Sequence, residues 1–202
     1  MLTQISFFLC VAPLFLPPSG WQAVQPKEFS SHAKIGFVGE STGPYRPSIH
    51  LTSEKVDCTL KAYLKAVKEI HLSQPNTVWR DLGCLEMKAG TGQLTESRTP
   101  KMSILQAIYL SDGVAYILTA AVSREDFLSK QKEIIAAFKS FDLSQDLWSA
   151  IKEEELRVGI LSAIEAKEWK KARQLIEKAN SSMGEYWQFL ALQEAYGKIY
   201  PK

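Results

Sequence analysis

The chain has 202 residues and a formal net charge of +2, from 24 Lys and Arg against 22 Asp and Glu. Apolar residues make up 46% of the chain and charged residues 23%, as in globular proteins with a core and unlike disordered or collagen-like chains. So small an excess of positive charge does not supply the phosphate attraction on which nucleic-acid binding depends. The composition therefore predicts one compact domain with an appendage, and no nucleic-acid partner.

Residues 1–13 are predicted to be either an apolar leader or the extension of a first strand. The apolar run of residues 5–16 is shorter than the roughly 20 residues of a membrane-spanning helix, so we expect no membrane span. A secretory signal carries positive charge before its apolar run, whereas the first Lys or Arg here is Lys27. We interpret the run as a buried strand that ends at Pro17-Pro18-Ser19-Gly20. An export signal stays open, with the cytoplasm slightly favoured.

The three cysteines, Cys10, Cys58 and Cys84, have neither the spacing of a zinc site nor that of a redox pair. We expect buried free thiols, and a bond between Cys58 and Cys84 stays open for an exported chain. The histidines are isolated from one another, without metal-binding spacing: His32, His50 and His71. The sequence predicts no metal site and no cofactor.

The middle of the chain alternates between strand and helix patterns. The predicted elements are strands over 34–37 and 48–56, a helix from 60 to 70 with its N-cap at Cys58-Thr59, a strand over 77–88, strands over 104–110 and 114–121, and a helix over 127–138. A bulge is expected at Gly83, a turn at Gly90-Thr91-Gly92, and after it a polar loop that runs through Pro100. Asp112-Gly113 is typical of a hairpin turn. This order predicts the α+β class, an α/β/α sandwich with a largely antiparallel sheet, over residues 14–142.

Residues 143–202 are predicted to be an all-α C-terminal extension. No Pro occurs between Ser144 and Pro201, and Gly is rare. Apolar residues recur at helical spacing in three successive sets, which predicts three short helices. Asn180-Ser181-Ser182 is interpreted as a helix stop.

Four short motifs resemble the PsbP-like and DcrB-like α/β/α sandwich superfamily over roughly residues 14–142. They are Pro17-Pro18-Ser19-Gly20-Trp21, Leu60-Lys61-Ala62-Tyr63, Tyr116-Ile117-Leu118-Thr119 and Ser140-Phe141. These motifs are structural signposts. The resemblance implies a non-enzymatic role through contacts with other proteins, because most members act in that way.

Residues 163–196 resemble a single degenerate tetratricopeptide-type unit. The resemblance rests on Trp169-Lys170-Lys171-Ala172 and Ile176-Glu177-Lys178-Ala179. One such unit cannot bury a continuous core alone. It is therefore expected to pack on the first domain or on a partner.

The sequence predicts a non-enzymatic protein-binding or scaffold protein whose partner is another protein. No catalytic residue is predicted, because no nucleophile elbow of the Gly-x-Ser-x-Gly type is present. The candidate partner-binding residues are Trp169, Tyr186 and Trp187, since Trp and Tyr are favoured at interface hot spots. Trp187 is expected to be the most exposed of them. The alternative is a small exported envelope protein with a ligand-binding or hydrolytic pocket, which keeps a small-molecule ligand open.

Overall fold

The computed structural model of the chain describes residues 12–24, 33–41, 43, 45–144 and 146–200. It divides into two compact units: a sandwich unit of Phe15–Asp142, and a helical unit of Met1–Leu14 with Leu143–Lys202. The predicted α+β class with a helical C-terminal part is confirmed.

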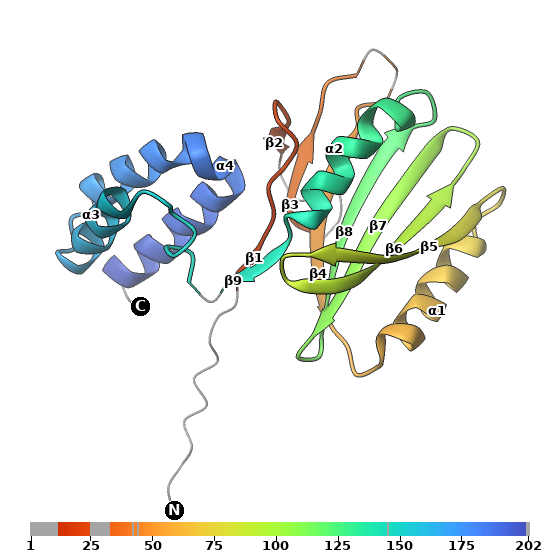
Figure 1. The fold of residues 1–202 in the computed structure, drawn as a ribbon, viewed down its shortest axis with the longest axis horizontal. Helices are drawn as coiled ribbons and strands as arrows, with labels where there is room; N and C mark the ends of the chain where they lie inside the picture. Colours follow the sequence, from red (N-terminus) through yellow and green to blue (C-terminus); the bar gives the residue numbers. More distant parts are fainter. Residues whose placement is uncertain (1–11, 25–32, 42, 44, 145, 201–202) are drawn as a thin grey trace, which may run out of the picture. The chain divides into compact units, whose positions relative to one another are not determined.

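A seven-stranded antiparallel sheet forms the centre of the sandwich unit, in the order β2-β3-β4-β8-β7-β6-β5 (Figure 1). Its strands are β2 (Gln22–Val24), β3 (Ala33–Val38), β4 (Ser48–Lys55), β5 (Val78–Met87), β6 (Gly90–Arg98), β7 (Met102–Ser111) and β8 (Val114–Ser123). The predicted hairpin is β7–β8. Asp112 and Gly113 take φ angles of 49° and 71° in its turn, the positive values that this type of turn requires.

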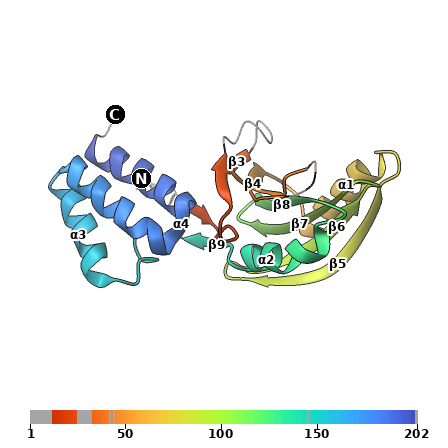
Figure 2. The ribbon, with the colours of Figure 1, turned by 90° about the horizontal axis from the view of Figure 1, so that it is seen from above.

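Two helices, α1 (Leu60–Leu72) and α2 (Phe127–Lys139), cover opposite faces of this sheet (Figure 2). Because side chains alternate along a strand, neighbouring residues of β7 face different helices. Ile108 packs in the cluster that α1 covers. Tyr109 points the other way, and its ring centroid lies 6.0 Å from that of Phe141, which directly follows α2 and its C-cap. The sandwich therefore has a helix on each face, as predicted.

Strand β6 corrects the prediction of a polar loop that follows Gly92 and runs through Pro100. Its buried side chains are polar, namely Thr95, Glu96 and Ser97, so the apolar alternation that marks a strand is missing. Glu96 is only 2% exposed, and its carboxylate lies 2.6 Å from Nε of Arg98. This pairing compensates the burial of a charge that would otherwise be costly.

The start of the sandwich unit is held by close packing around Trp21. The N–H of Trp21 donates to the carbonyl of Pro18 at 3.2 Å, which closes the predicted turn. A Cβ on Gly39 would lie 2.7 Å from the Trp21 ring, so only glycine fits beside it. The N–H of Leu16 donates to Oγ of Ser140 at 2.7 Å. Two of the motifs that carry the superfamily resemblance thus stabilise the fold.

The first strand and the cysteines differ from prediction. Strand β1 (Ala12–Leu14) belongs to a separate two-stranded sheet with β9 (Asp142–Ser144), outside the seven-stranded sheet. Residues 5–11 of the predicted strand, which include Cys10, lie outside the described residues, and so does His32. Cys58 and Cys84 are free thiols and are exposed, so the expectation of burial is wrong. Their positions explain this, because Cys58 lies in the loop before α1 and Cys84 lies on the edge strand β5.

The helical unit contains α3 (Glu154–Glu165) and α4 (Trp169–Ile199). The prediction of three separate helices is wrong in its number of elements, because the second and third apolar sets both fall within α4. However, α4 is not straight. The rings of Trp169 and Tyr196 lie 5.3 Å apart, whereas a straight helix would separate these positions by about 40 Å.

Helix α4 therefore folds back, and Figure 2 shows its two arms side by side. The sequence midpoint between Trp169 and Tyr196 falls between Ser182 and Met183, which places the reversal near the predicted stop at Asn180-Ser181-Ser182. Apolar side chains from both arms share one core with α3. The tetratricopeptide-type interpretation of this unit stays a prediction.

Candidate binding surfaces

Helix α1 is held to the sheet without a single buried side chain. Its N-cap is Thr59, whose Oγ1 accepts from the N–H of Ala62 at 3.3 Å. The hydroxyl of Tyr63 donates to the carboxylate of Glu54 on β4. Burial raises the pKa of Tyr63, and the hydrogen bond to Glu54 raises it further, so the hydroxyl keeps its proton at neutral pH.

The C-terminal end of α1 is held by a polar contact too. Nε2 of His71 lies 3.0 Å from Oε1 of Gln106 on β7. The Gln106 amide donates in turn to Oγ1 of Thr119 on β8, at 3.2 Å. Polar contacts at both ends therefore add to the partly buried apolar side chains by which α1 packs on the sheet, Leu60, Tyr63, Leu64 and Val67.

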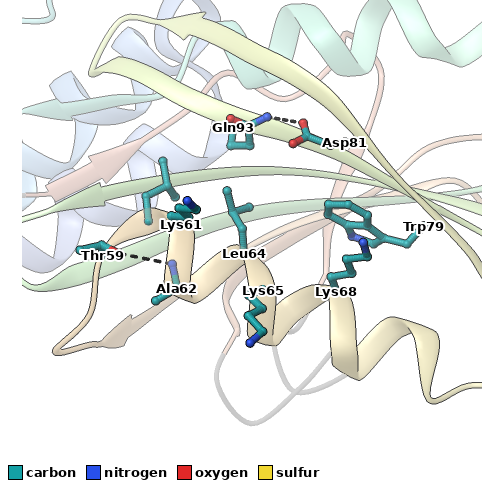
Figure 3. A pocket seen from close by; sticks show the side chains of 10 residues that line it. Thr59, Lys61, Ala62, Leu64, Lys65, Lys68, Trp79, Asp81 and Gln93 are labelled. Carbon is teal, nitrogen blue, oxygen red and sulfur yellow. Dashed lines mark hydrogen bonds between the residues drawn. The ribbon is translucent and has the colours of Figure 1, made fainter.

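An open groove of about 940 Å³ lies between α1 and the strands β5 and β6; we call it the α1 groove (Figure 3). Helix α1 contributes the apolar side chains of Leu60 and Leu64, and β5 contributes Trp79. Three lysines from α1 also line it: Lys61, Lys65 and Lys68. We call these three residues the lysine row.

The lysine row lies on one side of α1 because its members are four and three residues apart. All three side chains are exposed. The ammonium of Lys68 lies 5.4 Å from the ring centroid of Trp79, within cation–π range. Lys65 is directed away from the sheet (Figure 3), but its flexible four-carbon stem allows the ammonium to turn toward the groove.

The sheet side of the α1 groove holds one carboxylate, that of Asp81. Its Oδ1 accepts from the amide of Gln93 on β6 and, at 2.8 Å, from the N–H of Gly83. Gly83 has a φ of 90° at the predicted bulge, a conformation that favours glycine. Asp81 is therefore occupied by neighbours on the sheet, and the lysine row dominates the charge of the groove.

His50 lies on β4, on the same face of the sheet as α1, opposite Thr119 in the register. Burial lowers its pKa to about 4, so the imidazole is neutral at physiological pH. Over the described residues, no cluster of three or more His, Cys, Asp or Glu side chains could hold a metal ion. His50 is therefore a half-buried sheet residue, outside the groove.

A second surface lies on the helical unit, where Trp169, Tyr196 and Tyr200 form what we call the aromatic cluster. The ring of Tyr196 meets that of Trp169 edge-on at 5.3 Å and lies 4.9 Å from that of Tyr200. Tyr196 is 55% exposed and Tyr200 is 50% exposed. Lys170 and Lys171 lie beside the cluster and line the same shallow hollow.

The structure separates the three residues predicted to bind a partner. Trp169 belongs to the aromatic cluster. The expectation that Trp187 is exposed is wrong: it is 2% exposed, and its indole N–H donates to the carbonyl of Leu147 at 2.9 Å. Its ring also meets Trp148 edge-on at 6.2 Å, which places it in the core of the helical unit. The side chain of Tyr186 lies outside the described residues.

Sequence reasoning did not select Tyr196 for binding, and it missed Tyr200 and the lysine row. Tyr196 was assigned to an apolar core set, and only the reversal of α4 brings it to Trp169. Lysines at helical spacing are usually a solvated face, so the row gave no signal by itself. The available signal was that no acidic residue occurs among residues 60–68.

No family model matches the chain, and no curated protein matches it by sequence. Solved structures do match the chain by their fold. LpqN of Mycobacterium tuberculosis, involved in cell envelope biogenesis, is 14% identical with a TM-score of 0.50; the match covers 66% of this chain and 84% of LpqN.

Two further structures are similar at lower scores. The cyanobacterial PsbP of Synechocystis is 13% identical, with 66% of this chain and 92% of that one covered and a TM-score of 0.46. The Ran-binding protein Mog1p of Saccharomyces cerevisiae is 10% identical, with 67% and 85% covered and a TM-score of 0.40. The match to LpqN shows a shared fold alone.

Within the part of the chain that is described, no helix has the length and hydropathy that a membrane span requires.

Proposed function

We propose that this protein is a non-enzymatic binding or scaffold protein that contacts another protein through the aromatic cluster of its helical unit. The observation that carries the proposal is the exposure of Tyr196 and Tyr200 beside Trp169. Tyr and Trp supply large contact areas at low entropic cost and are enriched at hot spots. The superfamily resemblance, which implies contacts with other proteins, supports the same role.

The core of the helical unit does not need the two tyrosines. Its buried residues come from α3, from both arms of α4 and from residues 147–151, and neither Tyr196 nor Tyr200 is among them. Exposed aromatic side chains that the fold can spare are available for a partner. The neighbouring Lys170 is exposed as well, and Lys171 pairs with Glu168 at 3.1 Å beside it, so the surface combines aromatic area with charges of both signs.

A second candidate function is a ligand-binding role for the sandwich unit, which the volume and the apolar floor of the α1 groove favour. Binding pockets typically combine apolar walls with a few polar groups. The groove is lined by one carboxylate, that of Asp81, with no His, Cys or Ser side chain among its lining residues. We therefore assign binding rather than hydrolysis to it in this proposal.

Quantitative affinity capture of the full chain, from the cells that make it, tests the protein-binding role. The test variant is Tyr196→Ser with Tyr200→Ser. The matched control is Val158→Ser with Leu161→Ser, which removes exposed apolar side chains from α3 of the same unit. We expect the wild type and the control to retain the same partner, and the tyrosine variant to lose it with an unchanged circular dichroism spectrum.

Two outcomes would overturn the proposal. One is that the wild-type chain repeatedly captures no protein. The other is that the tyrosine variant retains its partner as well as the control does.

A further inference from the structure

The positive charges on α1 lie at positions that lower the stability of the helix. Lys61 and Lys65 are four residues apart, and Lys65 and Lys68 are three apart, spacings at which like charges destabilise a helix. The first turn contains no acidic residue, although the positive end of the helix dipole favours one and disfavours Lys61. Since α1 has no fully buried side chain, the positions of these charges are not explained by the stability of the helix.

The other helices of the described chain hold basic residues in ion pairs. Each has an ion pair at the spacing of one helical turn: Lys130 with Glu133 on α2, Glu154 with Arg157 on α3, and Arg173 with Glu177 on α4. Within the described residues, no member of the lysine row is in an ion pair. The row therefore places three positive charges, none of them in an ion pair with a described residue, along one wall of a groove.

We propose that the α1 groove binds an extended acidic peptide segment of a partner protein. Its carboxylates pair with the lysine row, and an apolar side chain between them packs on Trp79. This deepens the proposed protein-binding function and rests on it, but it assigns a separate surface, on the sandwich unit. It also gives the partner a chemistry, that of acidic residues alternating with apolar ones.

The spacing of the lysine row favours an extended strand as the occupant. Lys61 and Lys65 are separated by about 6 Å along the helix axis. Two residues of an extended chain advance about 6.6 Å, and side chains two apart point to the same side. Carboxylates at alternate positions therefore meet successive lysines of α1, while the intervening side chain points to the opposite side, toward Trp79 on β5.

The shape of the surface favours a peptide over a lipid membrane. The apolar side chains of Leu60, Leu64 and Trp79 line a hollow between the helix and the sheet. A flat membrane surface reaches protruding side chains better than it reaches such a floor, whereas an extended peptide is narrow enough to enter. Vesicles of phosphatidylserine and phosphatidylcholine are therefore included in the test as the competing ligand.

The experiment measures the fluorescence anisotropy of a labelled heptapeptide of alternating Asp and Leu, titrated with the full chain. A peptide of the same composition, with its Asp and Leu residues in two blocks, tests the spacing. The test variant is Lys61→Gln with Lys65→Gln, which keeps the contact of Lys68 with Trp79. The matched control is Lys132→Gln with Lys139→Gln, two exposed lysines of α2.

We expect the wild type and the control to bind the alternating peptide equally, and the test variant to bind it at least about fivefold more weakly, since exposed ion pairs are individually modest. The affinity should fall as salt screens the charges. The block peptide should bind more weakly than the alternating one.

Trp79→Phe supplies a second variant that probes the floor. The indole N–H of Trp79 is shielded from solvent and has no hydrogen-bond partner among the described residues, so phenylalanine loses ring area but no hydrogen bond. We expect this variant to keep its thermal transition within a few degrees and to bind the alternating peptide about two- to tenfold more weakly, because Trp is the strongest aromatic partner of Lys68.

Three outcomes would overturn the inference: no binding of the alternating peptide up to about 1 mM, equal loss in the test variant and the control, or binding of the chain to anionic vesicles alone. Each outcome is independent of the proposed role of the aromatic cluster. Loss of peptide binding with tyrosine-dependent capture intact would overturn only this inference, and the reverse result would overturn only the role of the cluster.

Discussion

Helices α1 and α2 have the same length, 13 residues, and cover opposite faces of one sheet, yet they are held in different ways. Helix α2 buries four side chains, with Ile134 and Phe138 fully enclosed. Helix α1 buries none, and the face of the sheet on its side carries polar residues such as His50, Gln106 and Thr119. The comparison teaches that α2 closes a buried core, while α1 is held by partly buried apolar side chains and polar contacts and presents its charges outward.

The largest difference is expected when an apolar side chain is removed from each helix. Phe138→Ala in α2 should lower the free energy of unfolding of the sandwich unit by about 3–5 kcal/mol, because it opens a cavity in a closed core. Leu64→Ala in α1 should cost only about 1 kcal/mol, since a half-buried side chain returns little area to water. Urea denaturation measures both. Equal losses would show that α1 is as much a part of the core as α2.

Protonation of His50 should lower the stability of the sandwich unit at a pH above that at which most carboxylates are protonated. The unfolded chain binds a proton on His50 near pH 6.5, whereas burial in the folded state lowers that pKa to about 4. Stability is therefore complete above pH 6.5 and falls as the pH drops toward 4, by about 1–2 kcal/mol at pH 5. Thermal melts across this range should show the loss, and His50→Gln should remove most of it. A variant with the same pH profile as the wild type would contradict this account.

Loss of the N-cap should affect α1 alone. Thr59→Ala removes the side-chain acceptor for the N–H of Ala62, at a cost of about 1 kcal/mol. Amide hydrogen exchange of α1 should then accelerate about fivefold, with exchange of α2 unchanged. If both helices accelerate together, α1 does not open as an independent unit.

The smallest expected effect is a gain in the stability of α1. Lys61→Gln relieves repulsion with Lys65 and with the positive end of the helix dipole, so it should stabilise α1 by a few tenths of a kcal/mol. Lys130→Gln, which removes the partner of Glu133 on α2, should destabilise by a similar amount. Hydrogen exchange of each helix separates the two. A loss of stability in Lys61→Gln would mean that Lys61 has a stabilising partner.

Elements with strong local signals were predictable from the sequence. The Asp112-Gly113 turn fixed the β7–β8 hairpin, and apolar spacing gave both helices of the sandwich, including Thr59 as a cap. Strand β6 was not predictable in this way, because its buried residues are polar and its backbone is paired only when β5 and β7 lie on either side. Local pattern alone carries no information on such long-range pairing.

The candidate surfaces were less predictable than the fold. Trp187 and Tyr196 both lie in the second arm of α4, and their apolar character does not say which one faces the core. The reversal of α4 decides that, since it turns Trp187 toward Leu147 and brings Tyr196 to Trp169. The α1 groove depends likewise on where β5 lies relative to α1. Surfaces formed by distant segments need the tertiary fold before they can be recognised.

Hydrogen exchange of the full chain, with and without the alternating Asp-Leu peptide, tests most directly whether α1 presents a binding surface while α2 closes a buried core. The account predicts slower exchange of amides in α1 and at the start of β5 when the peptide is bound, with α2 and the helical unit unchanged. Protection on α2, or no protection anywhere at a peptide concentration of about 1 mM, would contradict it.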